Sequence, residues 1–298
     1  MTRVLVTGGS GKLGRAVVTD LAENGYQVVN LDRVPTPGSS IPFVRVDLTD
    51  YGQVAAALQS VDDRYDGADA VVHLAAIPAP GLTTNAATFD NNITSTYHVF
   101  AAARAARIKT VVWASSETVL GLAFGPESPP PYIPVDEEYH SRPNSSYSLA
   151  KTLEEEMASQ FCRWDPELSM TGLRFSNVML PENYQAFPGF DADPATRRWN
   201  LWGYIDARDG AQAVRLALAA SRPGRDVFII AAADTVMSRS STALAAQVFP
   251  DVEVRKSLGE RETMLSIDKA RRVLGYQPQH SWRDHVSDHV SDQVTGRP

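Results

Sequence analysis

The sequence predicts an α/β fold, a doubly wound parallel sheet with a small C-terminal substrate lobe. Two observations predict this architecture. Over the first 177 residues, short strand-like apolar runs alternate with helical segments, and parallel strands require crossover connections of this kind. After residue 177 the alternation weakens, and residues 181–200 become rich in Pro, Gly, Asp and Asn, which is typical of loops.

The expected elements follow in order along the chain. Apolar and β-branched runs predict strands at 3–7, 26–31, 41–46, 70–74, 110–114 and 169–175. The spacing of apolar residues predicts helices that start at 13 and 54 and two long helices at 86–106 and 146–164. The second half is expected to hold helices at 207–220, 241–248 and 265–274, and a strand at 227–231.

The second half is expected to close over the carboxyl edge of the sheet. We divide the chain into a main domain of residues 1–177 and a mainly substrate-binding lobe of residues 178–298. Segment 206–232 is expected to return to the main domain. The stretch 126–134 holds five prolines, which stiffen the chain, and it forms either a rigid wall or lid of a site or a surface connector.

The composition is that of an ordinary soluble globular chain. Hydrophobic residues make up 43% and charged residues 21% of 298 residues, which excludes disorder as the main state. The net charge of -7, without basic blocks, argues against binding to nucleic acid or membrane. The single cysteine, Cys162, excludes an intramolecular disulfide. The apolar runs are too short to span a bilayer and a strand begins at residue 3, so we expect a cytoplasmic protein.

The residues after the first expected strand predict a dinucleotide site. Gly8, Gly11 and Gly14 are spaced three apart between a strand and a helix. Glycine lets backbone N–H groups approach a pyrophosphate, and the helix N-terminus adds partial positive charge. The spacing differs from Gly-x-Gly-x-x-Gly, so the strand–turn–helix context is what supports the prediction. The candidate cofactor residues of this loop are Gly8, Ser10, Gly11, Lys12, Leu13 and Gly14.

A carboxylate follows the second expected strand. Asp32 lies 18 residues after Gly14, where an acidic residue accepts hydrogen bonds from an adenosine ribose and repels a 2′-phosphate. This position favours NAD. The neighbouring Arg33 offers a surface for adenine or a contact for a 2′-phosphate, so NADP stays open. The alternative for Asp32 is a turn carboxylate before Pro35.

Tyr147 and Lys151 stand four residues apart on the expected helix 146–164, and therefore on one face. A tyrosine hydroxyl has an ordinary pKa of about 10 and is a poor base at neutral pH, but a lysine cation beside it lowers that pKa. Such a tyrosine exchanges a proton with a substrate hydroxyl while hydride moves to nicotinamide. The spacing is common on helix surfaces, so its meaning depends on the other motifs.

Taken together, these residues resemble the extended short-chain dehydrogenase/reductase superfamily, in its NAD-dependent epimerase/dehydratase branch. The resemblance covers essentially the whole chain, and the order of the motifs makes it specific. The motifs are the loop at 7–14, Asp32, Asp47-Leu48, and the segments 73–76, 92–96 and 115–121, followed by Tyr147 with Lys151 and the segments 173–178, 206–209 and 268–276.

The resemblance implies a Rossmann-type NAD(P)-binding fold and assigns roles by position. Ser116 resembles the catalytic Ser or Thr that hydrogen-bonds the reacting oxygen, Tyr147 the acid/base, and Lys151 the residue that lowers its pKa and holds the nicotinamide ribose. Asn177 lies where the family often contacts substrate, and His73 is expected to be structural. Further cofactor contacts are implied for Asp47 and Leu48 at adenine, for Leu74, Ala75 and Ala76, and for Asn92 as a helix N-cap and cofactor-side spacer.

Departures from the family pattern bear on the reaction. In dehydratases of this branch the catalytic Thr is followed by Asp and Glu, whereas here Ser116 is followed by Glu117 and Thr118, so dehydration is not expected. Leu120 replaces the Tyr that is common in nucleotide-sugar epimerases. The segment from 177 to 206 is short and lacks an obvious nucleotide clamp.

We therefore expect an NAD(P)-dependent oxidoreductase that acts on a CH–OH group of a sugar or sugar-derived substrate, with a layout similar to uronate dehydrogenases. Arg197 and Arg198 are candidates to bind a substrate carboxylate through a bidentate contact, or they form a solvated pair. Glu117 beside Ser116 adds negative charge against a uronate. The alternative is a sugar or nucleotide-sugar 4-epimerase with tightly bound NAD. A non-catalytic dinucleotide-binding regulator would be expected to lose Tyr147 or Lys151.

No metal is expected. His285 and His289 are four apart, but no further ligand accompanies them, so the polar face of a terminal helix is expected there. The long helices 86–106 and 146–164 resemble those through which the family pairs, which favours a homodimer, although core packing explains the same apolar pattern. The expected partner is a small sugar-like molecule.

Overall fold

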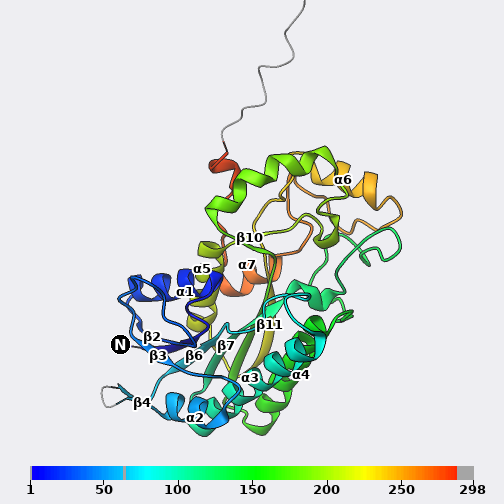
Figure 1. Cartoon of the computed structure of the whole chain (residues 1–298). Helices are drawn as coiled ribbons and strands as arrows, with labels where there is room; N and C mark the ends of the chain where they lie inside the picture. The colour runs from blue at the N-terminus through cyan, green and yellow to red at the C-terminus, as the bar shows by residue number, and fades with distance from the viewer. Residues whose placement is uncertain (1, 63–64, 287–298) are drawn as a thin grey trace, which may run out of the picture.

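The computed structural model describes residues 2–62 and 65–286, and a seven-stranded parallel sheet lies at its centre (Figure 1). The strand order is β11-β8-β7-β6-β1-β2-β3, and every neighbouring pair is parallel. This arrangement confirms the predicted doubly wound α/β fold. The strands are β1 (Arg3–Thr7), β2 (Gln27–Asp32), β3 (Phe43–Arg45), β6 (Ala70–His73), β7 (Thr110–Ser116), β8 (Ser169–Phe175) and β11 (Gly224–Ile230).

The strand order reverses between β1 and β6. From β1 the chain proceeds outward through β2 and β3, and it then builds β6, β7, β8 and β11 on the other side of β1. At such a switch point the loops that leave neighbouring strands diverge, and a crevice opens at the carboxyl ends of the strands. The topology therefore places a binding crevice between the residues that follow β1 and those that follow β6.

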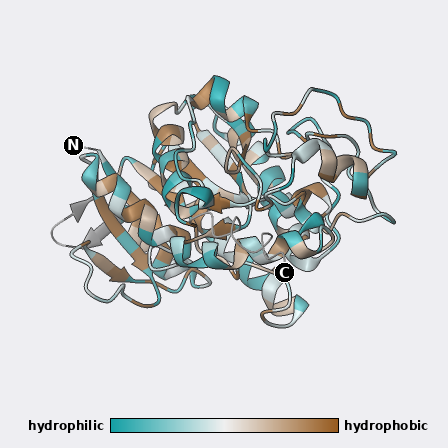
Figure 2. Ribbon diagram, turned by 90° about the horizontal axis from the view of Figure 1, so that it is seen from above, coloured by the Kyte–Doolittle hydropathy of each residue, from teal (hydrophilic) through white to brown (hydrophobic). Residues whose placement is uncertain are grey.

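Helices cover both faces of the sheet. α1 packs on α5 on one face, and α3 packs between α2 and α4 on the other (Figure 1). Side chains of one strand alternate between the two cores: Val4 and Val6 join the cluster under α1 and α5, whereas Leu5 joins the cluster under α2, α3 and α4. Apolar residues are concentrated along the strands (Figure 2). The helices are α1 (Lys12–Glu23), α2 (Tyr51–Gln59), α3 (Asn85–Ala105), α4 (Ser146–Trp164), α5 (Ala207–Ala219), α6 (Ser241–Val248) and α7 (Asp268–Leu274).

The lobe formed by the second half is built mainly from short elements. The segment expected to be loop contains two 3₁₀ segments, η2 (Pro181–Ala192) and η3 (Arg198–Asn200), between the paired strands β9 (Val178–Met179) and β10 (Ile205–Asp206). One hydrophobic cluster runs from β1 into this lobe as far as Trp282, so the domain boundary at residue 177 stays a prediction. The remaining elements are β4 (Ser60–Asp62), β5 (Tyr65–Asp66), η1 (Glu117–Leu120) and η4 (Trp282–Asp284).

The Pro-rich stretch 126–134 is attached to the lobe. Ile133 donates its N–H to Glu253 O at 2.9 Å and accepts from Arg255 N at 2.8 Å. The Arg255 guanidinium also lies 3.5 Å from the centre of the Tyr132 ring, within the range of a cation–π contact. These contacts fix the stretch against the lobe, and none of its residues lines the large cavity of the molecule.

Two expectations concern absences. Among residues 2–62 and 65–286, no helix combines the length and apolar character needed to cross a membrane. In the same part of the chain, no group of three or more His, Cys, Asp or Glu side chains is arranged to hold a metal ion. His285 follows η4, whereas His289 lies outside the described residues.

Candidate active site

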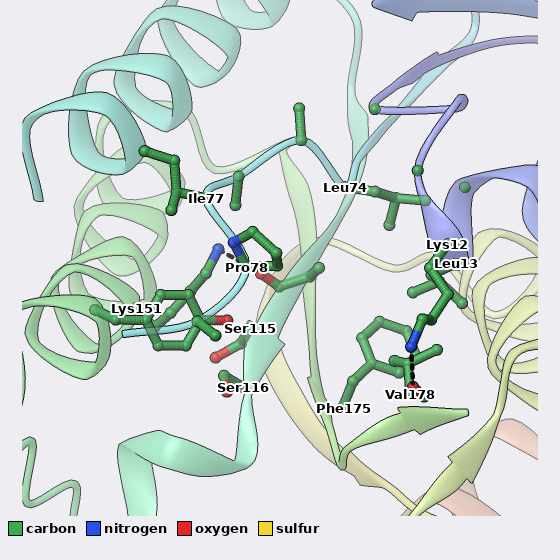
Figure 3. Close-up of a pocket in the computed structure, with 18 of the residues that line it drawn as sticks. Lys12, Leu13, Leu74, Ile77, Pro78, Ser115, Ser116, Lys151, Phe175 and Val178 are labelled. Carbon is green, nitrogen blue, oxygen red and sulfur yellow. Dashed lines mark hydrogen bonds between the residues drawn. The ribbon is translucent and has the colours of Figure 1, made fainter. Parts of the chain in front are cut away.

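A cavity of about 960 Å³ lies at the switch point of the sheet. It begins at the loop after β1, passes the residues after β6, and ends where β7 meets the start of α4 (Figure 3). All of the predicted loop residues and all three predicted catalytic residues line this one cavity. The lining residues from the predictions are Gly8, Ser10, Gly11, Lys12, Leu13, Gly14, Asp32, Arg33, Leu48, Leu74, Ala75, Ala76, Ser116, Glu117, Tyr147, Lys151 and Asn177.

The glycines of the first loop are required by close backbone approach. Gly8 has a φ of +74°, and a Cβ there would lie 2.6 Å from Ala75 N. A Cβ on Gly14 would lie 2.1 Å from Gly8 O. Both clashes are with backbone, which has no rotamer to yield. The loop thus closes around the first turn of α1, whose unpaired N–H groups are at the cavity, and this geometry fits a pyrophosphate.

Asp32 is held at the far end of this loop. Its carboxylate accepts hydrogen bonds from Ser10 N at 3.1 Å and from Arg33 N at 2.6 Å. The Arg33 guanidinium lies 2.9 Å from Asp47 Oδ1, and this contact, with hydrogen bonds from Thr49, lowers the pKa of Asp47 to about 2. Asp47 is not among the lining residues, so the structure does not place it at adenine as predicted; it holds Arg33 instead.

Asn92 has a different position from the one expected. The N-cap of α3 is Thr84, whose hydroxyl accepts from Ala87 N at 3.3 Å, so Asn92 lies inside the helix and caps nothing. Its side chain is buried and accepts from Ile77 N at 2.8 Å and donates to Ile77 O at 3.0 Å. Asn92 therefore fixes the wall that follows β6. The helix starts within one residue of the predicted range 86–106, and only the N-cap role of Asn92 is wrong, because the Thr84 hydroxyl takes that role.

Tyr147 and Lys151 are positioned by the start of α4. Ser145 and Ser148 form a capping box that fixes the first turn, and Tyr147 lies within that turn. Lys151 donates to Ala114 O at 2.9 Å and to Glu154 Oε2 at 2.9 Å. Burial raises the pKa of Tyr147, whereas the Lys151 ammonium and Ser116 oppose that rise. The lysine thus acts on the tyrosine in the direction that the sequence predicted.

Ser115 and Ser116, adjacent at the end of β7, have different partners. Ser116 Oγ faces the cavity and accepts from Thr118 N at 3.2 Å and from the Thr118 hydroxyl at 3.0 Å. Ser115 donates to Glu155 Oε1 at 2.6 Å, and Arg174 binds both oxygens of the same carboxylate at 2.9 and 2.8 Å. This buried group ties β7 and β8 to α4 and so aligns Tyr147 with Ser116.

Two buried carboxyls on α4 escaped the sequence reasoning. Glu154 and Glu155 follow Lys151 by three and four residues, and both are buried, whereas Glu156 is exposed. The signal was available, because residues three and four apart share a helix face. Three consecutive glutamates are typical of a solvent-exposed surface. Only their positions along the helix distinguish the two buried residues from the exposed Glu156.

The substrate end of the cavity differs from the prediction at the two arginines. Neither Arg197 nor Arg198 is among the lining residues. Arg197 is 8% exposed and donates to Gly203 O at 3.0 Å, so its guanidinium is turned into the lobe. Trp199, which the sequence analysis did not select, lines the cavity in their place.

Glu117 lines the cavity as predicted, but it is buried and held. It accepts from Ser176 Oγ at 2.6 Å and from Asn200 Nδ2 at 3.1 Å. Burial raises the pKa of Glu117 to about 7, against the effect of these hydrogen bonds. Near neutral pH this carboxyl is therefore only partly charged, which weakens the predicted repulsion of a uronate.

This geometry defines a class. A Rossmann-type sheet, a glycine-rich loop at its switch point, and Ser116, Tyr147 and Lys151 at the other end of the same cavity are the features of an extended short-chain dehydrogenase/reductase. The chain belongs to the NAD dependent epimerase/dehydratase family, whose family model matches residues 4–231. It is accordingly an enzyme of the NAD-dependent type.

Known relatives agree with this assignment. The chain is 32% identical to a UDP-glucose 4-epimerase of Yersinia pestis over 185 residues, which is 58% of this chain and 52% of that protein. It is 29% identical to the UDP-glucose 4-epimerase of Homo sapiens over 224 residues, 68% of this chain and 60% of that protein. The chain thus spans only about half to three fifths of the length of these relatives.

Solved structures match over nearly the whole chain. MoeE5 in complex with UDP-glucose and NAD is 26% identical, with a TM-score of 0.70 and 95% coverage of both chains. A UDP-glucose-4-epimerase from Stenotrophomonas maltophila with bound NAD and formylated UDP-arabinopyranose is 21% identical, with a TM-score of 0.72 and 96% coverage of both chains. The second likeness concerns the fold.

Proposed function

We propose that this chain is an NAD-dependent oxidoreductase that acts on a CH–OH group of a sugar or sugar-derived substrate. The observation that supports it is the single cavity, which joins the phosphate loop and Asp32 at one end to Ser116, Tyr147 and Lys151 at the other. Gly8 and Gly14 let the backbone of the loop pack closely, and the N-terminus of α1 beside the cavity suits a pyrophosphate. Asp32 fits an adenosine ribose without a 2′-phosphate, which favours NAD over NADP.

The side chains of this chain have the following parts in the proposed reaction. NAD, when bound, supplies the acceptor for the hydride. Tyr147 takes the proton of the substrate hydroxyl, and Ser116 Oγ holds that oxygen in place. Lys151 stabilises the ionised form of Tyr147 by its charge and has one N–H left for a ribose hydroxyl.

Two forms of this reaction are open, and each has its own support. The named relatives favour a sugar-nucleotide 4-epimerase that keeps NAD through turnover. The charges of the cavity favour a dehydrogenase of a sugar without a diphosphate. Of the cations that line it within residues 2–62 and 65–286, Arg33 and Lys151 are paired with the carboxylates of Asp47 and Glu154, and Lys12 donates to the carbonyl of Val178. A nucleoside diphosphate is normally held by cations that are free to meet it.

The nucleotide content of the purified protein separates the two forms. The protein is denatured as isolated, and any released nucleotide is identified by mass spectrometry. Stoichiometric NAD or NADH, together with interconversion of UDP-glucose and UDP-galactose, supports the epimerase. An empty protein that forms NADH from added NAD and a neutral aldose, a polyol or a uronate supports the dehydrogenase. Failure to bind NAD in any form would refute the proposed function.

We also propose a homodimer formed through α3 and α4. Large apolar side chains are exposed on these helices, which supports the proposal. Light scattering during size exclusion tests it, and a monomer at micromolar concentration would refute it. The exposed residues are Tyr97, Leu149, Leu153 and Trp164.

A further inference from the structure

Glu154 is a buried carboxyl beside the proposed active-site lysine, and the proposed reaction gives it no part. It lies one turn after Lys151 on α4, and its Oε2 is 2.9 Å from Lys151 Nζ. The side chains of Lys151 and Glu154 are 3% and 0% exposed. Water screens the charges of such a buried pair only weakly, so each group strongly affects the protonation of the other.

The contacts of Lys151 leave it little freedom. An ammonium group has three N–H donors. One donates to Ala114 O on β7 and a second to Glu154 Oε2, both at 2.9 Å. Two acceptors on different elements therefore fix the position of the positive charge, and the third donor remains for a ligand.

The other groups around Glu154 come from α3 and β6. Burial raises the pKa of Glu154, and Lys151 and Thr96 oppose that rise. The Thr96 hydroxyl also lies 3.0 Å from His73 Nε2. Burial lowers the pKa of His73 to about 3, so this ring is neutral. Within the described part of the chain, Lys151 is thus the cation that faces Glu154.

The neighbouring carboxylate does not compete for Lys151. Glu155 is bound on both oxygens by Arg174 and is also approached by Arg225 at 3.8 Å. Its charge is therefore matched by arginines on β8 and β11. Glu154 therefore forms the direct ion pair with Lys151, and Glu155 adds only a through-space charge interaction that also raises the pKa of the lysine.

We propose that Glu154 is a positioning residue of the active site, which holds the Lys151 ammonium in place and offsets its charge at the Tyr147 hydroxyl. Lys151 and Glu154 together are nearly neutral, so Tyr147 feels only part of the lysine charge. The groups that face Tyr147 are Lys151 and Ser116, which favour its ionised form, and Glu154 and Glu117, which disfavour it. The enzyme is therefore set to work at a higher pH than a lone lysine would allow.

The sign of the effect does not depend on which group of the site titrates. Tyr147 and Lys151 are coupled and lose their first proton as a pair. A negative charge beside the pair makes that loss harder, whichever of the two gives up the proton. Removal of the Glu154 charge must therefore lower the pH at which the pair loses a proton.

The test compares Glu154→Gln with Glu156→Gln. Both substitutions remove one carboxylate from the same turns of α4, but Glu156 is exposed and its charge is screened by water. We expect Glu154→Gln to move the acidic limb of the kcat/KM profile for substrate oxidation to lower pH by about one unit, which is a tenfold gain on that limb. Glu156→Gln should leave the limb in place.

The inference rests on the proposed function, so a second readout avoids turnover. Ultraviolet difference titration of the protein against its Tyr147→Phe counterpart isolates the ionisation of Tyr147, and the same subtraction is made in the Glu154→Gln background. A lower titration midpoint supports the proposal even if no substrate is found. Failure to find NAD-linked turnover then counts against the proposed function alone.

Several outcomes would overturn the inference. The first is that Glu154→Gln leaves the acidic limb of the kcat/KM profile or the titration midpoint of Tyr147 in place. The second is that it moves either of them to higher pH. The third is that Glu156→Gln produces an equal shift. If Glu154→Gln does not fold, Glu154→Asp provides the alternative, because the shorter side chain moves the carboxylate away from the Lys151 ammonium, 2.9 Å from it in the native protein. This variant should give a smaller shift in the same direction, and no shift would contradict the proposal.

Discussion

The buried group around Glu155 should be a major contributor to the stability of the active-site end of the sheet. Glu155 and Arg174 are each 4% exposed, and the carboxylate accepts from Arg174 Nε, Arg174 Nη2 and Ser115 Oγ. Glu155→Gln leaves the guanidinium buried without its counter-ion. Such losses cost about 3 to 5 kcal/mol, which is a large part of the roughly 5 to 15 kcal/mol that keeps a protein folded.

The free energy of unfolding is measured by urea denaturation at neutral pH. A double variant, Glu155→Leu with Arg174→Met, tests the reason for the loss. Both buried charges are then absent, so stability should return towards that of the native protein. Activity should not return with it, because Ser115 loses its partner and β7 is no longer tied to α4 through the carboxylate.

The pH dependence gives a second check on the same argument. Burial would raise the pKa of Glu155, but Arg174 and Ser115 outweigh it and the pKa is lowered. A lowered pKa contributes stability above the ordinary carboxyl pKa of about 4.3, and that stability is lost as pH falls through the folded value. The difference between the native protein and Glu155→Gln should shrink below about pH 4. A loss under about 1 kcal/mol at pH 7, or a gap that widens in acid, would refute the reasoning.

Three further predictions follow from the site. Tyr147→Phe should lower turnover by about 10² to 10⁴-fold while NAD still binds; near-normal turnover would remove Tyr147 from the mechanism. Gly14→Ala should abolish NAD binding in calorimetry because its Cβ meets Gly8 O, whereas Gly189→Ala, with open space around it, should bind normally; equal affinities would contradict the proposed phosphate loop. Asn92→Ala should weaken NAD binding and lower the melting temperature, because the polar groups of Ile77 lose two hydrogen bonds worth about 1 kcal/mol each; an unchanged protein would show that other contacts hold this wall.

The main sheet and the glycine-rich loop were predictable because their signals are local. The strands of the sheet are short apolar runs, and their alternation with helices leaves the parallel arrangement as the natural solution. The glycines at 8 and 14 stand where backbone must pass close to backbone. The order of strand, turn and helix around these glycines was enough to predict a tight loop there.

The wrong expectations concern side chains whose partners come from elsewhere in the chain. Asn92 was expected to cap a helix, but Thr84 starts the helix and Asn92 reaches Ile77. Arg197 was expected at the substrate, but the fold of the lobe turns it to Gly203 O. A residue type does not specify which of several possible partners the fold will bring to it.

The sequence by itself determined the fold class, and it predicted the glycine-rich loop and Ser116, Tyr147 and Lys151, which the structure brings to one cavity. The tertiary structure decided which charges are paired. Three consecutive glutamates on α4 have one chemical identity, yet one faces Lys151, one faces Arg174 and one faces water. That difference arises because helix geometry sets their directions, while β7, β8 and α3 decide what each direction meets.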